Sequence, residues 1–153
     1  MVAFMRENRL LDAGGIFRDK EGEWVLGFCE KTEWESSLSA ELMGIYRGIS
    51  IIYEKSMNSV EIESDCIQAI RLIQNIDDDK NHPQQYIIRE ARALLQRTGA
   101  TLRHISRSAN QCADHLARLG AETGNPLLLM ETMPVSVREF WIRDKLRITE
   151  ILD

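Results

Sequence analysis

The chain has 153 residues, of which 44% are apolar and 28% are charged, and its net charge is −5 at pH 7. These values predict one globular domain, exclude a disordered chain, and argue against a protein held on nucleic acid by bulk attraction to phosphate. No apolar run is long enough to cross a bilayer, and residues 1–20 lack the apolar centre of a signal peptide. We therefore expect an intracellular protein, cytoplasmic or nuclear.

The first third of the chain is predicted to form strands. We expect a short strand over 2–5, a polar turn over 6–9, and two longer strands over 13–19 and 23–31. Residues 20–22, between the two longer strands, have the length and the glycine of a hairpin loop. The chain therefore opens with a three-stranded antiparallel unit.

Helical and extended patterns alternate in the middle of the chain. Apolar residues recur at spacings of three and four from Ser36 to about residue 55, and this pattern predicts a helix. The next predicted elements are a strand over 60–65, a short helix, a helix over 84–97 ended by Gly99, a strand over 100–106 and a helix over 110–120 closed by Gly120. This order predicts an α/β domain over 1–121.

Residues 122–153 are predicted to be a C-terminal extension. It contains a short apolar run over 127–130, and Ser136 and Glu139 have the spacing of a capping box. We therefore expect a helix over 136–152, which packs on the core or contacts a protein partner. The three isolated cysteines, Cys29, Cys66 and Cys112, are expected to be reduced core thiols rather than disulfide or zinc ligands.

Three carboxylates come from separate predicted elements. Asp65 ends a strand, the place where ligands collect in open α/β sheets, while Glu41 lies early in one helix and Asp114 in another. Each also has a structural interpretation: Asp65 as a helix N-cap with Gln68, Glu41 as a charge that suits the helix dipole, and Asp114 as the partner of Arg118 on a solvated face. Brought together, they would repel unless metal ions neutralised them, and all-oxygen ligation suits Mg²⁺.

Four blocks of sequence occur in a specific order and spacing. They are AGGIFRD over 13–19 followed by Gly22 and 24–28, AEL over 40–42, ESD over 63–65, and the stretch over 104–117 that runs from a histidine to ADHLA. In these blocks the chain resembles the ribonuclease H type 1 superfamily, in particular the plant reverse-transcriptase-like domains related to retroelements. The resemblance covers roughly residues 1–121.

The resemblance implies a mixed sheet, with three antiparallel strands followed by parallel strands, flanked by helices. It also implies metal-dependent cleavage of the RNA strand of an RNA/DNA hybrid, which is recognised by shape and 2′-hydroxyls. By the same resemblance, the metal ligands for Mg²⁺ or Mn²⁺ are Glu41, Asp65 and Asp114. His104 is the residue that aids water delivery or product release, and Asn110 is the polar residue near it. We expect Asn110 and the basic Arg107 to bind the substrate.

One position departs from the family pattern. The first strand of the family carries Asp followed by Gly, and Met1 and Val2 stand at that place here, while Glu7 and Asp12 fall in the expected turn region. The carboxylate that both metal ions would share is therefore absent. Either the start of the chain is shortened, or this copy of the domain has lost its activity. A second hypothesis follows, an inactive module that binds nucleic acid or a protein through its cleft or C-terminal helix. An α/β domain with unrelated chemistry is a third.

Overall fold

The computed structural model describes residues 2–7, 13–31, 36–74, 82–107, 111–123 and 126–152. The elements in chain order are β1 (Val2–Glu7), β2 (Ala13–Arg18), β3 (Trp24–Glu30), α1 (Ser37–Glu54), β4 (Glu61–Ser64), α2 (Ile67–Ile73), α3 (Gln85–Thr98), β5 (Thr101–His104), α4 (Gln111–Thr123), β6 (Leu128–Met130), the 3-10 turn η2 (Val135–Val137) and α5 (Arg138–Leu152). No helix within these described ranges has both the length and the apolar character needed to span a membrane.

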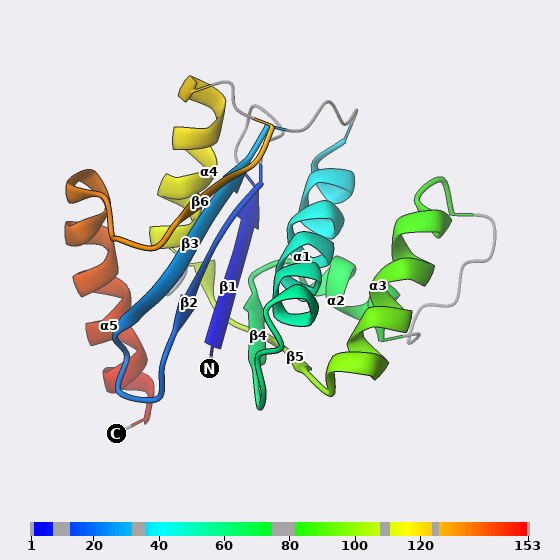
Figure 1. Cartoon of the computed structure of the whole chain (residues 1–153), viewed down its shortest axis with the longest axis horizontal. Coiled ribbons are helices and arrows are strands. Elements are labelled where there is room, and N and C mark those ends of the chain that lie inside the picture. The colour runs from blue at the N-terminus through cyan, green and yellow to red at the C-terminus, as the bar shows by residue number, and fades with distance from the viewer. Residues whose placement is uncertain are drawn as a thin grey trace.

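The described strands form a six-stranded mixed sheet with the order β5-β4-β1-β2-β3-β6 (Figure 1). β1, β2 and β3 are antiparallel, which confirms the predicted antiparallel start, and β4 and β5 are parallel to β1. Because parallel strands end at the same edge of a sheet, the carboxyl ends of β1, β4 and β5 lie side by side. Asp65 directly follows β4 at this edge.

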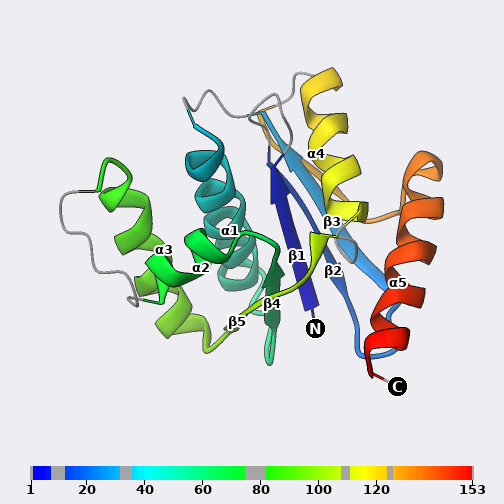
Figure 2. The same ribbon diagram turned by 180° about the vertical axis from the view of Figure 1, so that it is seen from behind.

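Helices cover both faces of the sheet (Figures 1 and 2). Side chains alternate between the faces of a strand, so Phe17 of β2 joins the core beneath α1, α2 and α3, while its neighbour Ile16 joins a second core with α4. The predicted apolar stripe of α1 is buried in the first core, with Leu42 and Ile45 fully inaccessible to solvent. The three layers therefore put α1 and α4 on opposite sides of the strands that end near Asp65.

Several predicted boundaries were wrong. β1 continues to Glu7, because residues 6 and 7 pair with Gly14 and Ala13 of β2 instead of forming a turn. α4 continues past Gly120, where a glycine near a helix end costs only about 1 kcal/mol relative to alanine. α5 begins after η2, so Ser136 is not its N-cap, and the apolar run over 127–130 contains β6, which pairs with β3.

Gly99 ends α3 in the left-handed region, with φ of +68°, as the sequence predicted. A Cβ at this position would meet no atom within 4 Å, so strain alone should decide the effect of Gly99→Ala, a loss of roughly 1–2 kcal/mol of unfolding free energy. Gly44→Ala in α1 is the control: its Cβ would lie 3.5 Å from that of Ala13, an ordinary contact, and alanine is favoured in a helix by about 0.5–1 kcal/mol. Urea unfolding should give opposite signs for the two variants, and the same sign would contradict this interpretation.

Candidate active site

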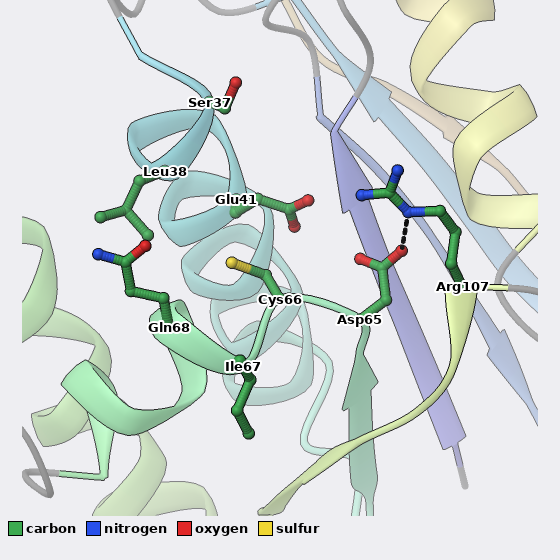
Figure 3. Close-up of a pocket in the computed structure, with 8 residues that line it drawn as sticks. All are labelled: Ser37, Leu38, Glu41, Asp65, Cys66, Ile67, Gln68 and Arg107. Carbon is green, nitrogen blue, oxygen red and sulfur yellow. Dashed lines mark ion pairs between the residues drawn. The ribbon is translucent and has the colours of Figure 1, made fainter.

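A cleft of about 300 Å³ opens at the sheet edge where β4 ends (Figure 3). Its walls come from the start of α1, from the junction between β4 and α2, and from the segment that follows β5. The lining residues are Ser37, Leu38, Glu41, Asp65, Cys66, Ile67, Gln68 and Arg107. Two carboxylates predicted as site residues, from separate elements, are therefore in one cavity.

Glu41 reaches the cleft from the second turn of α1. The helix starts where it does because Ser36 is its N-cap, with Oγ accepting a hydrogen bond from the Ser39 N–H at 3.2 Å. Glu41 is 5% exposed and lies beyond the first turn of the helix. Because the helix dipole acts within the first turn, it does not account for this carboxylate. Burying a carboxylate costs free energy, so its place in the cleft favours a role in binding or catalysis.

Asp65 enters the cleft from the end of β4, and its side chain is 3% exposed. The alternative prediction that Asp65 caps the following helix was wrong. The N-cap of α2 is Cys66, whose N–H donates to Ser64 Oγ at 3.1 Å. In Figure 3 the carboxylates of Glu41 and Asp65 point toward the same space between α1 and β4. The structure therefore brings these two predicted site residues together.

Arg107 and His104 belong to the end of β5 and the segment that follows it. The Nε atom of Arg107 is 3.6 Å from Oδ2 of Asp65, marked by the dashed line in Figure 3. The Arg107 side chain is 79% exposed, so solvent screens this ion pair strongly. His104 ends β5 opposite Ser64 in the parallel register; its side chain is exposed and does not line the cleft. Arg107 is thus beside Asp65, and His104 is at the adjacent strand end.

The structure leaves two predicted site residues undecided. Asp114 lies in the first turn of α4, but its side chain falls outside the described part of the chain, as does all of Asn110. Among the side chains that are described, no three His, Cys, Asp or Glu residues gather closely enough to hold a metal ion. Glu41 and Asp65 are therefore the part of the predicted ligand set that can be placed.

The other acidic residues of β4 have a basic partner on the neighbouring strand. Arg103 Nη2 on β5 lies 2.5 Å from Oε1 of Glu63 and 3.3 Å from Oε1 of Glu61. Burial raises the pKa of Glu63, and Arg103 opposes that rise. Glu61 and Glu63 thus form an ion-pair cluster with Arg103 on the sheet, whereas Asp65, which follows them in sequence, lines the cleft. The acidic run over 77–79 lies outside the described residues.

Cys66 lines the cleft, which the sequence did not indicate. All three cysteines are free thiols, as predicted, and Cys29 and Cys112 are buried, but Cys66 is only partly buried. Burial, together with the charges of Glu41 and Asp65, raises the pKa of the Cys66 thiol from its ordinary value of 9.0 to about 11. Its position directly after Asp65 is the only signal in the sequence that it could reach the cleft.

The raised pKa of Cys66 predicts slow alkylation. Below pH 9 the thiolate fraction, and with it the iodoacetamide rate, should be roughly 100-fold lower than for an unperturbed thiol. The rate should rise about tenfold per pH unit until the pH approaches the pKa of about 11. Mass spectrometry of the Cys66 peptide between pH 7 and 11 measures this dependence, and a rate that levels off by pH 9 would contradict it.

The chain is similar in sequence to known proteins. Residues 2–120 match the reverse transcriptase-like family. A protein of Arabidopsis thaliana named as a candidate ribonuclease H is 34% identical over 109 residues, which are 71% of this chain and 17% of that relative. This chain therefore corresponds to a small part of the length of the relative.

Solved structures share the fold. RNase H1 from the archaeon Halobacterium salinarum superposes with a TM-score of 0.73 at 16% identity, over 80% of this chain and 97% of its own. LC11-RNase H1 from compost, solved in complex with an RNA/DNA hybrid, gives a TM-score of 0.71 at 13% identity, over 80% of this chain and 97% of its own. The chain therefore belongs to the reverse transcriptase-like family, and its fold is that of the RNase H1 enzymes.

Proposed function

We propose that this chain is a metal-dependent endoribonuclease that cleaves the RNA strand of RNA/DNA hybrids. The observation that carries the proposal is the convergence of Glu41 and Asp65, two buried carboxylates from separate elements, on one open cleft. The cleft opens at the sheet edge where the parallel strand β4 ends, which is where α/β sheets collect ligands. The likeness to an RNase H1 solved with a bound hybrid supports this substrate class.

The chemistry of the cleft fits Mg²⁺. Carboxylate oxygens are hard ligands, and Mg²⁺ typically takes one or two carboxylates from a protein while it keeps several waters. The cleft of about 300 Å³ leaves room for these waters. Glu41 and Asp65, completed by Asp114 from α4, would hold the ions, with Mn²⁺ as the alternative. When bound, such ions activate the attacking water and stabilise the leaving oxygen in phosphodiester cleavage.

Other residues of the chain would position the substrate and move protons. The exposed guanidinium of Arg107 can bind a phosphate of the scissile strand through charge-assisted hydrogen bonds. His104, exposed at the end of β5, can act as a general acid or base. Asn110 directly precedes α4 and is the remaining proposed substrate contact.

A second candidate function follows from the register of β1. Met5 pairs with Ser64, so the next residue, Arg6, is level with Asp65, whereas Val2 pairs with Glu61 at the other end of β4. The β1 position that follows Met5, at the end of β4 where Asp65 stands, is therefore an arginine in the sequence and not Asp or Glu. This favours an inactive module that binds nucleic acid or protein, because a residue without a carboxylate at this position supplies no oxygen ligand to a divalent cation.

Cleavage of end-labelled substrates distinguishes the two functions. The chain should cut the RNA strand of a hybrid in Mg²⁺ or Mn²⁺, should stop in EDTA, and should leave double-stranded DNA intact. Binding of the hybrid without cleavage in either metal would favour the inactive module. Neither binding nor cleavage would reject both.

A further inference from the structure

Asp144 of α5 lies at the start of α4, more than thirty residues earlier in the chain. It is fully buried, and its carboxylate accepts hydrogen bonds from the backbone N–H groups of Gln111 at 2.9 Å and Cys112 at 2.7 Å. Arg18 Nη2 of β2 is 3.6 Å from Oδ2 of Asp144. The first N–H groups of a helix have no partner within the helix, and a negative charge there is favoured by the helix dipole. Asp144 therefore caps α4 from a distant part of the chain.

The surroundings of Asp144 show that α5 is docked on α4. Val137 is buried in the same apolar cluster as Cys112 and Leu116 of α4. The rings of His115 and Phe140 stack with centroids 4.7 Å apart. Burial raises the pKa of Asp144, and the two backbone N–H groups and Arg18 oppose that rise. Burying this carboxylate costs desolvation free energy. Its hydrogen bonds to two successive backbone N–H groups fix both the axial position and the rotation of the first turn of α4.

That turn also carries Asp114, three residues after Gln111. Metal ligands must be held within about 0.5 Å of their working geometry by supporting contacts. The cap by Asp144 is such a contact, because it fixes the backbone of the turn that contains Asp114. We propose that Asp144 is a positioning residue that sets α4, and hence Asp114, relative to Glu41 and Asp65. This inference rests on the proposed metal-dependent function.

The test compares Asp144→Asn with Glu139→Gln in the full chain. Both variants remove one negative charge from α5, but Glu139 is exposed and pairs with Arg143 on the same helix. The asparagine side chain of Asp144→Asn has one oxygen, so it can accept only one of the two backbone N–H hydrogen bonds well. We expect amide exchange of Gln111 and Cys112 to become roughly tenfold faster, Mg²⁺ binding to weaken roughly tenfold, and kcat to fall with the KM for hybrid nearly unchanged. Glu139→Gln should change none of these quantities.

Faster exchange with unchanged Mg²⁺ affinity and kcat would reduce Asp144 to a purely stabilising role and overturn the proposal. Unchanged exchange would overturn it as well. Residual dipolar couplings of the α4 amides, measured against those of the sheet, report the orientation of α4 whether or not the chain binds metal. A reoriented α4 in a chain that binds no metal even as wild type would reject the proposed function and support the positioning role. If Asp144→Asn does not fold, Asp144→Ser, which keeps one acceptor in a smaller side chain, takes its place.

Discussion

Asp65→Asn is expected to reduce metal-dependent cleavage of an RNA/DNA hybrid by on the order of 100-fold or more. The amide removes the charge that attracts the metal but keeps the shape of the side chain. Stability should change in the opposite direction, because without metal the buried carboxylates of Asp65 and Glu41 face one cleft and repel each other. The melting temperature in EDTA should therefore be equal to or higher than that of the wild type. Cleavage assays and thermal unfolding measure the two effects.

Two further substitutions on α1 complete this test, one inside the cleft and one outside it as the matched control. Glu41→Gln should have the same effects as Asp65→Asn, since both residues line the cleft. Glu54→Gln removes an exposed carboxylate at the end of the same helix and should change neither cleavage nor stability appreciably. Loss of cleavage together with a large loss of stability in Asp65→Asn would show that Asp65 supports the fold rather than the chemistry.

Arg6→Asp is expected to strengthen Mg²⁺ binding by roughly tenfold to 100-fold, which corresponds to about 1.4–2.8 kcal/mol. The reason is the register of β1, which places residue 6 level with Asp65. The substitution introduces a carboxylate at the β1 position that follows Met5, the partner of Ser64 at the end of β4. Without metal the variant should be less stable than the wild type, and saturation at 100 times the Kd should restore about 2.7 kcal/mol. Calorimetric titration and thermal unfolding with and without Mg²⁺ measure both effects.

Replacing Met1 and Val2 by Asp and Gly is the competing test. The sequence pattern alone puts the missing carboxylate there, but in the structure Val2 is level with Glu61, at the far end of β4 from Asp65. Tighter Mg²⁺ binding in this variant, with none in Arg6→Asp, would contradict the register-based assignment.

Much of the fold could be predicted because its local signals are strong. The apolar stripe of α1, the N-cap Ser36 and the left-handed Gly99 each have one physical cause within a few residues. The local sequence did not predict the structure where pairing with another strand decides it. Residues 6 and 7 are polar but are held in β1 by pairing with β2, and the three-residue strand β6 is too short to show an alternating pattern.

The candidate site was predicted in part. Glu41 and Asp65 stand at recognisable positions, one early in a helix and one at a strand end, so sequence could select them. It could not place Cys66 in the cleft, because that depends on how α2 begins. Nor could it pair Asp144 with Gln111, because their contact spans 33 residues and exists only once α5 packs on α4.

The central claim is that Glu41 and Asp65 form one Mg²⁺ site, and NMR titration of the wild-type chain with Mg²⁺ tests it most directly. The proposed function predicts that the backbone amides of both residues shift together and saturate with a single Kd, and that Asp65→Asn removes both shifts. Shifts confined to the acidic run over 77–79, or none at all, would contradict a metal site in the cleft.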